Sequence, residues 1–178
     1  GLVRYPLATW APSPNYTRGR GGTAVDRVVI HHTDGQERSD RAVAHLRNAE
    51  PSSGHRVSAH FLIGQEGDVF QLVDTSDTAW HCSGWNARSI GIEHIARTPG
   101  EFSKADPGFP LTTAQLQASA KLVAWLLHEL KLPIEAVVPH CSSPTTTHKD
   151  CGRDAADGGI WPWEDYIGMI VEALTALS

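Results

Sequence analysis

Short apolar runs separated by polar residues predict the strands of this chain. DRVVIHHT (26–33) and RSIGIEHIA (88–96) are rich in β-branched residues, as expected of buried strands, and AVVPH (136–140) is a shorter run of the same kind. SAHFLIGQEGDVFQLV (58–73) contains two apolar runs around Gly67, which is typical of a hairpin.

Helical spacing of apolar residues predicts three helices. TTAQLQASAKLVAWLLHELK (112–131) is the longest, SDRAVAHLRN (39–48) is a short helix capped by Ser39, and residues 161–177 form a closing helix with Pro162 at its first position. Strands and helices then alternate in the order β, α, β, β, β, α, β, α. This order favours a single α/β domain with a central mixed β-sheet flanked by helices.

The first 25 residues are rich in proline and glycine, which predicts an irregular leader packed on the domain surface. Residues 26–178 would then form one domain, a size that a single core can organise. Hydrophobic residues make up 40% of the chain and charged residues 20%, so it can bury enough apolar surface to fold without extensive cross-links.

Charge and hydropathy exclude two classes of partner. Fifteen basic residues against twenty acidic ones give a net charge of -5, and no cluster of lysines and arginines occurs, so we expect no nucleic-acid partner. No run approaches 18 apolar residues, so we expect no membrane span, and the start GLVRYPL lacks the features of a signal peptide. We expect a monomer.

Histidines and cysteines at strand ends and in one loop predict a metal site. The chain has ten histidines; His31 and His32 end the first strand, and His140 ends a later one, eleven residues before Cys151. A catalytic zinc needs three protein ligands and one open position, and the metal lowers the pKa of its bound water to about 7. Because successive strand residues point to opposite faces, only one of His31 and His32 is expected to reach the metal, and the pattern does not choose between them.

Two charged residues accompany these ligands. Glu93 shares a strand face with Gly91, which places a carboxylate beside a cleared space, and a buried carboxylate favours a catalytic or ion-paired role. Lys149 lies two residues before Cys151, where its ammonium either faces the molecule bound at the metal or is solvated at the surface.

AWHCSGWN (79–86) combines aromatic and amide side chains suited to a peptide or sugar ligand. Trp80, His81 and Asn86 are candidates for this role, and tryptophans packed at a loop edge are the alternative. An odd count of three cysteines fits one metal thiolate plus one disulfide, which would join Cys82 to Cys141 if Cys151 binds metal.

Taken together, five motifs resemble the zinc-dependent N-acetylmuramoyl-L-alanine amidases of type 2, a family that includes peptidoglycan recognition proteins, phage amidase lysozymes and anhydromuramyl-peptide amidases. The resemblance spans roughly residues 26–165 and rests on VVIHHTDG, RVSAHFLIGQEGDVFQLV, TAWHCSGWN, RSIGIEHIA and HKDCGRD.

The resemblance implies roles for individual residues. Zn²⁺ would be held by His31, His140 and Cys151, Lys149 would stabilise the oxyanion, and Glu93 would be the general base. His60 and His81 would line the cleft and orient the substrate.

This chain departs from the family pattern in two places. Ala59 stands where phage and animal members have a tyrosine, so more of the proton transfer falls to Glu93. Gly152 and Arg153 follow Cys151 where the family usually has Pro-Gly, which leaves the nearby His148 as a rival ligand.

The expected activity is hydrolysis of the amide between the lactyl group of N-acetylmuramic acid and L-alanine, in peptidoglycan or a muropeptide. The alternative is a recognition module that binds peptidoglycan without cleaving it. A third reading is a purely structural zinc domain, which would need four protein ligands and no open coordination position. A Cys82–Cys141 bridge would fit an oxidising compartment. We therefore expect a protein secreted to the cell wall or periplasm, or a phage lysin domain.

Overall fold

The computed structural model describes residues 4–145 and 160–178 as one α/β domain built on a mixed six-stranded sheet. The strand order is β1-β5-β4-β7-β3-β8. Strands β4, β7, β3 and β8 are parallel neighbours, β5 runs antiparallel to β4, and β1 is parallel to β5. The strands span Thr9–Trp10 (β1), Arg27–His32 (β3), Phe61–Ile63 (β4), Val69–Gln71 (β5), Ser89–His94 (β7) and Val137–Pro139 (β8).

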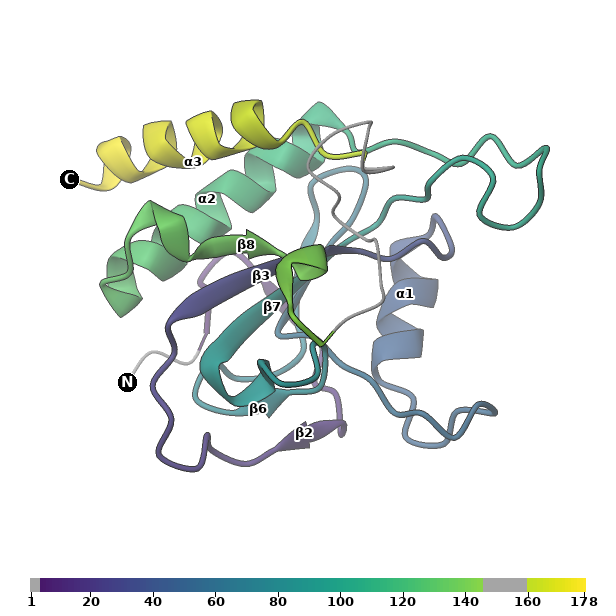
Figure 1. Cartoon of the computed structure of the whole chain (residues 1–178), viewed down its shortest axis with the longest axis horizontal. Helices are drawn as coiled ribbons and strands as arrows, with labels where there is room; N and C mark the ends of the chain where they lie inside the picture. The colour runs from purple at the N-terminus through teal and green to yellow at the C-terminus, as the bar shows by residue number, and fades with distance from the viewer. Residues whose placement is uncertain (1–3, 146–159) are drawn as a thin grey trace.

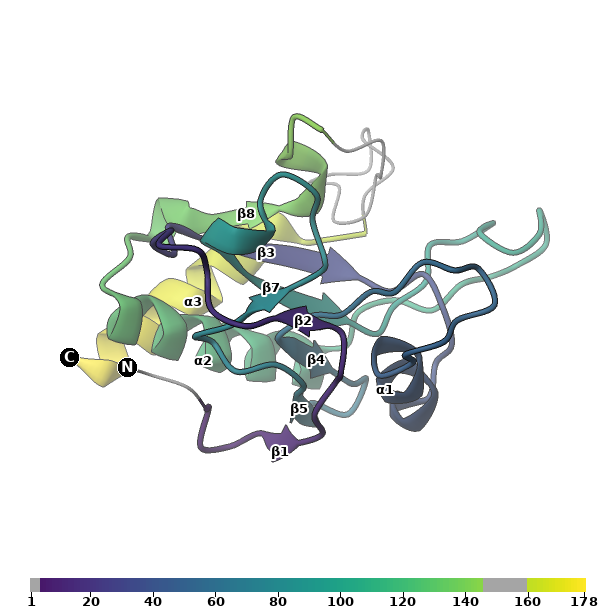
Figure 2. The same ribbon diagram turned by 90° about the horizontal axis from the view of Figure 1, so that it is seen from below.

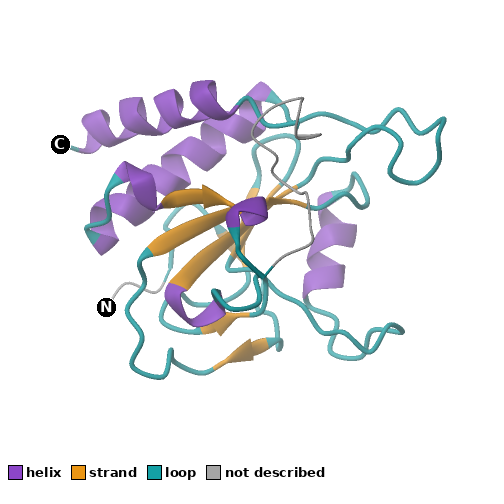
Figure 3. Cartoon of the chain, viewed as in Figure 1, coloured by secondary structure: helices purple, strands orange, loops and turns teal. Residues whose placement is uncertain are grey.

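Helices cover both faces of the sheet (Figures 1 and 3). Helices α2 (Thr113–Leu130) and α3 (Trp163–Leu177) lie side by side on one face, and α1 (Ser39–Leu46) lies near the end of β3. A separate antiparallel pair consists of β2 (Tyr16–Thr17) and β6 (Thr78–Ala79), both labelled in Figure 1, and β2 is seen in front of the main sheet in Figure 2. Short 3₁₀ turns are η1 (Asn86–Arg88), η2 (Ile134–Ala136) and η3 (His140–Ser142).

Alternation along β4 divides the core into two parts. Phe61 and Ile63 pack with the residues of α2 and α3, whereas Leu62 packs with Ala42 and Leu46 of α1 on the other face. All three β4 side chains are fully buried. The period of two along a strand is therefore what gives the sheet its two covered faces.

The predicted elements are confirmed, and so is the fold class. The hairpin turns at Gly67, whose φ of +84° suits a residue without a side chain. Helix α2 begins at a capping box in which the Thr112 hydroxyl accepts from the Gln115 amide and the Gln115 side chain accepts from the Thr112 amide. Among the described residues, no helix is both long and apolar enough to cross a membrane.

Two details of the helix ends were predicted wrongly. Ser39 does not cap α1: the N-cap is Arg38, and the Ser39 hydroxyl instead donates to Asp68 Oδ2 at 2.6 Å. Pro162 is the N-cap of α3 rather than its first residue. In both cases the helix begins one residue away from the position that the local sequence favours.

The described part of the leader is more ordered than its composition predicts. It contains β1 and β2, and β1 extends the main sheet at its edge. Tyr5 is only 7% exposed, packs in the core beside Trp125, and its amide donates to Gln71 Oε1 at 2.8 Å. The leader thus contributes to the same core as the rest of the domain.

Candidate active site

The parallel pairing of β3 with β7 brings the predicted chemical groups together. In this register His31 lies opposite Glu93, and Val29 lies opposite Gly91. Because each strand alternates, His31, Glu93 and Gly91 share the face of the sheet that α1 covers. His140 follows β8 on the other side of β3, so its side chain arrives at the same end of the sheet.

These residues form a compact imidazole cluster beside a carboxylate. The ring centroids of His31 and His140 are 4.5 Å apart, and those of His31 and His81 are 5.1 Å apart. His31 Nε2 lies 2.9 Å from His81 Nδ1, and His31 Nδ1 lies 3.9 Å from Glu93 Oε1. The arrangement gathers two of the three predicted metal ligands and the predicted general base.

His32 takes a structural position, which answers the question that the strand pattern left open. Its Nε2 lies 3.1 Å from Asp34 Oδ2 and 3.3 Å from Thr98 Oγ1. Burial alone would raise the pKa of Asp34, but hydrogen bonds from His32 and Thr98 outweigh it and lower that pKa. His31 is therefore the strand-end histidine that joins the cluster.

Gly91 clears a space, as predicted, but a side chain of this chain fills it. A Cβ atom on Gly91 would lie 2.5 Å from the His81 ring, which is closer than such atoms approach. On its far side His81 Nε2 lies 3.0 Å from Ser89 Oγ. Burial, followed by the charges of neighbouring histidines and of Arg20, holds the pKa of His81 well below its usual value.

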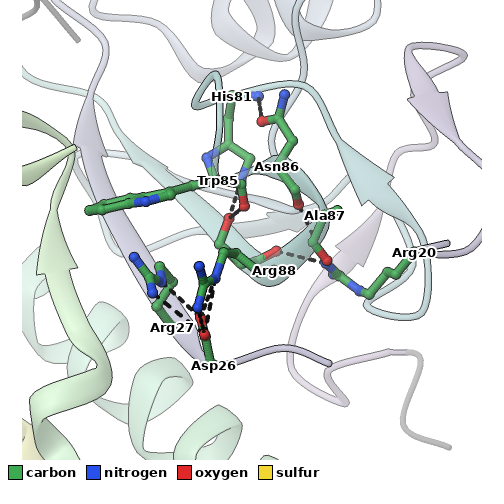
Figure 4. A network of polar contacts seen from close by, with 9 residues as sticks. Arg20, Asp26, Arg27, His81, Trp85, Asn86, Ala87 and Arg88 are labelled. Carbon is green, nitrogen blue, oxygen red and sulfur yellow. Dashed lines mark hydrogen bonds and ion pairs between the residues drawn. The ribbon is translucent and has the colours of Figure 1, made fainter. Parts of the chain in front are cut away.

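The loop that carries His81 is fixed by an amide and a guanidinium (Figure 4). Asn86 Oδ1 accepts hydrogen bonds from the backbone amides of His81 and Cys82, at 2.9 and 2.8 Å. Arg20 donates to the backbone carbonyls of Thr75, Ala87 and Ser89 at 2.8 to 3.1 Å, and burial lowers its pKa to about 10. Asn86 thus shapes the loop, and its predicted contact with substrate stays a prediction.

Sequence reasoning missed Arg20 because nothing local sets it apart from the other arginines of the leader. The backbone carbonyls to which it donates lie 55 to 69 residues away in the sequence, and a backbone carbonyl carries no sequence signal.

His60 lies inside the fold. It is fully buried and does not line the cavity. Its Nδ1 accepts from the Gly91 amide at 3.1 Å and its Nε2 donates to the Asp77 carbonyl at 2.9 Å, while burial lowers its pKa to about 3. Its backbone amide also donates to the Gly91 carbonyl at 3.0 Å, so His60 is tied to β7, and its predicted contact with substrate stays a prediction.

A cavity of about 820 Å³ opens over the cluster. Trp80 and His81 line it, and the Trp80 indole N–H donates to Thr17 Oγ1 at 3.0 Å, which holds the ring in place. Arg41 and His45, one helical turn apart on α1, also line the cavity and were not predicted. The remaining chemical lining comes from His31, His32, Asp34, Glu93, Glu101 and His140.

The rest of the predicted metal site lies outside the described residues: the ligand Cys151, the oxyanion residue Lys149 and the rival ligand His148. Within residues 4–145 and 160–178, no group of three or more histidine, cysteine or acidic side chains is arranged to hold a metal ion. The two imidazoles of His31 and His140 nevertheless fit zinc, which accepts neutral imidazole readily and needs one further ligand from the protein.

The structure does not contain the predicted Cys82–Cys141 disulfide. Cys82 is buried and Cys141 is exposed, and no bond joins them.

Comparison with known proteins agrees with this geometry. A model of the family described as N-acetylmuramoyl-L-alanine amidase matches residues 21–154. The chain is 31% identical over 121 residues to N-acetylmuramoyl-L-alanine amidase A of Achromobacter lyticus, covering 67% of this chain and 61% of that protein. It is 30% identical over 105 residues to peptidoglycan-recognition protein 1 of Holotrichia diomphalia, covering 55% and 51%. The chain thus spans about half to three fifths of the length of these relatives.

Solved structures share the fold. A structure of AmpD superposes with a TM-score of 0.71 at 22% identity, covering 92% of this chain and 96% of that one. The amidase AmiD from E. coli superposes with a TM-score of 0.64 at 23% identity, covering 82% and 57%. Sequence and fold lead to one conclusion: the chain belongs to the type 2 N-acetylmuramoyl-L-alanine amidase family.

Proposed function

We propose that this protein is a zinc-dependent N-acetylmuramoyl-L-alanine amidase. It would hydrolyse the amide between the lactyl group of N-acetylmuramic acid and the L-alanine of a stem peptide. The observation that carries the proposal is the His31–His140 imidazole pair, 4.5 Å between ring centroids, with the Glu93 carboxylate 3.9 Å from His31 on the wall of an open cavity.

The residues divide the chemistry among them. His31 and His140, with Cys151, would hold zinc, which when bound polarises the scissile carbonyl and acidifies a water. Glu93 Oε1 accepts the proton of the attacking water and returns it to the L-alanine nitrogen as the amide bond breaks. The Lys149 ammonium is proposed to stabilise the negative charge that develops on the carbonyl oxygen.

The cavity supports a glycopeptide substrate. Trp80 offers an aromatic face for an apolar sugar surface, and the cavity of about 820 Å³ is large enough for a sugar with several amino acids. The solved AmiD complex holds the substrate anhydro-N-acetylmuramic acid-L-Ala-D-gamma-Glu-L-Lys. We propose a related muropeptide for this chain.

A peptidoglycan-binding module without activity is the second candidate, because the relatives include peptidoglycan-recognition proteins. A module that only binds has no need of a general base. The half-buried Glu93 carboxylate, facing both the cavity and His31, therefore favours the enzyme.

The two candidates are separated with wild-type protein, Glu93→Gln and the matched control Glu66→Gln, whose side chain is exposed in the β4–β5 turn. Each is incubated with muropeptide, and free stem peptide is measured by mass spectrometry. The enzyme predicts release by wild type and by Glu66→Gln, and a loss of at least about 100-fold in Glu93→Gln. Binding of muropeptide by wild type without any release would establish the recognition module instead.

The location of the protein also stays a prediction. Secretion to the cell wall or periplasm, or presence in a phage lysin, follows from the proposed substrate alone. Fractionation of the native source with an antibody against this domain would decide it.

A further inference from the structure

A chain of hydrogen bonds leads from a backbone carbonyl to the proposed metal ligand His31. Ser89 Oγ lies 2.7 Å from the Trp85 carbonyl oxygen and 3.0 Å from His81 Nε2. His81 Nδ1 lies 2.9 Å from His31 Nε2. Ser89 is fully buried, and His81 and Trp85 are seen on the same loop in Figure 4.

The direction of every bond in this chain follows from one fixed acceptor. The Trp85 carbonyl has no proton, so the single Ser89 hydroxyl proton is donated to it. Ser89 Oγ can then only accept from His81, which places the His81 proton on Nε2. A neutral imidazole carries one N–H, so His81 Nδ1 accepts, and the bond to His31 must be donated by His31 Nε2.

We propose that His81 is a positioning residue that fixes the tautomer of His31, with Ser89 setting the tautomer of His81 in turn. His31 then carries its proton on Nε2 and presents the lone pair of Nδ1, the nitrogen that lies toward Glu93. A metal-bound histidine usually has its second nitrogen held in this way by an outer partner, which orients the ring and raises its basicity. Here the outer partner is another histidine.

Three contacts within the fold hold His81 in this position. Gly91 leaves room for the ring, because a Cβ atom there would lie 2.5 Å from it. Asn86 holds the His81 backbone amide at 2.9 Å, and Ser89 holds Nε2. The fold itself therefore holds the His81 ring against His31, with no substrate needed to place it.

The inference rests on the proposed zinc site, so its first test uses the metal-free protein and needs no activity. Long-range ¹H–¹⁵N NMR spectra of ¹⁵N-histidine-labelled protein report which ring nitrogen of His31 carries the proton. We expect the Nε2–H form in wild type and a mixture of both forms in Ser89→Ala. A wild-type His31 protonated on Nδ1, or a His31 tautomer unchanged in Ser89→Ala, would overturn the proposal.

Zinc affinity gives the second test, by competition with a fluorescent chelator. His81→Leu, which removes the acceptor, is expected to weaken zinc binding about 10- to 100-fold. His81→Asn places an amide oxygen near the position of Nδ1 and is expected to restore much of the affinity. Equal affinity in wild type, Leu and Asn variants would contradict the positioning role.

Ser119→Ala is the matched control. Ser119 is also fully buried and bonds a buried histidine, His94, at 2.6 Å, but on the opposite face of β7. It should leave the His31 tautomer and zinc affinity unchanged, and an effect equal to that of Ser89→Ala would reduce the role of Ser89 to packing. If wild type shows the expected tautomer and zinc binding but releases no stem peptide, the proposed function fails while this inference holds.

Discussion

Replacing Gly91 with alanine tests the packing on which the cluster depends. The added Cβ would lie 2.5 Å from the His81 ring, whereas carbon atoms in contact normally lie at least about 3.5 Å apart. The ring must retreat by roughly 1 Å in an interior that is already packed, and overpacking of this kind costs about 1–3 kcal/mol. Weakening the His81–His31 bond adds about 1 kcal/mol.

We therefore expect Gly91→Ala to lower the free energy of unfolding by about 2–4 kcal/mol. Urea titration followed by circular dichroism measures it. Gly168→Ala is the control, because Gly168 lies on the exposed side of α3 with nothing within 4 Å of an added Cβ. It should raise the free energy of unfolding by up to about 1 kcal/mol through helix propensity.

A double-mutant cycle identifies the cause. In a His81→Ala background the clash partner is gone, so Gly91→Ala should cost far less than in wild type. The reasoning is refuted if Gly91→Ala costs less than about 0.5 kcal/mol in wild type, or costs the same in both backgrounds.

Three further predictions concern other parts of the site. Arg20→Met should lower the free energy of unfolding by about 3 kcal/mol because the buried carbonyls it bonds lose a charged donor, whereas the exposed Arg18→Met should change it little; thermal or urea unfolding of both variants checks this. His60 has a folded pKa of about 3, below the unfolded value of about 6.5, so only the unfolded state gains its proton as the pH falls. The stability that neutral, buried His60 contributes is therefore present above pH 6.5 and is lost as the pH drops towards 3. On this account, lowering the pH from 7 to 5 should reduce the free energy of unfolding by about 2 kcal/mol through His60. Urea titrations at each pH should show that His60→Gln removes this part of the pH dependence. Cys151→Ser should abolish zinc retention after dialysis, and if His148→Ala abolished it instead, the third ligand would have been chosen wrongly.

Sequence reasoning predicted what depends on periodicity. The alternation along β3 and β7 was enough to place Glu93 with Gly91 and to say that only one of His31 and His32 reaches the cluster, since a strand has a fixed period of two. The same reasoning predicted the sheet and its helices, because long apolar patterns leave few ways to be buried.

What the sequence did not reveal depends on contacts between distant segments. His60 and Asn86 have the residue types of a binding site, yet they bond the Gly91 amide and the His81 loop, and only the tertiary structure reveals that use of their polar atoms. Strands β1 and β2 have two residues each, which is too short for any alternating pattern to detect. Gly91 was correctly predicted to clear a space, but the ring that fills it comes from a different loop.

Removal and return of zinc tests the central claim most directly. The protein is stripped of metal with a chelator, dialysed, and incubated with muropeptide before and after one equivalent of Zn²⁺ is added, and free stem peptide is measured by mass spectrometry. The account predicts no release by the stripped protein and full release after zinc is returned, with L-alanine as the new amino terminus of the product. Undiminished release by the stripped protein, or no release once zinc is bound, would contradict it.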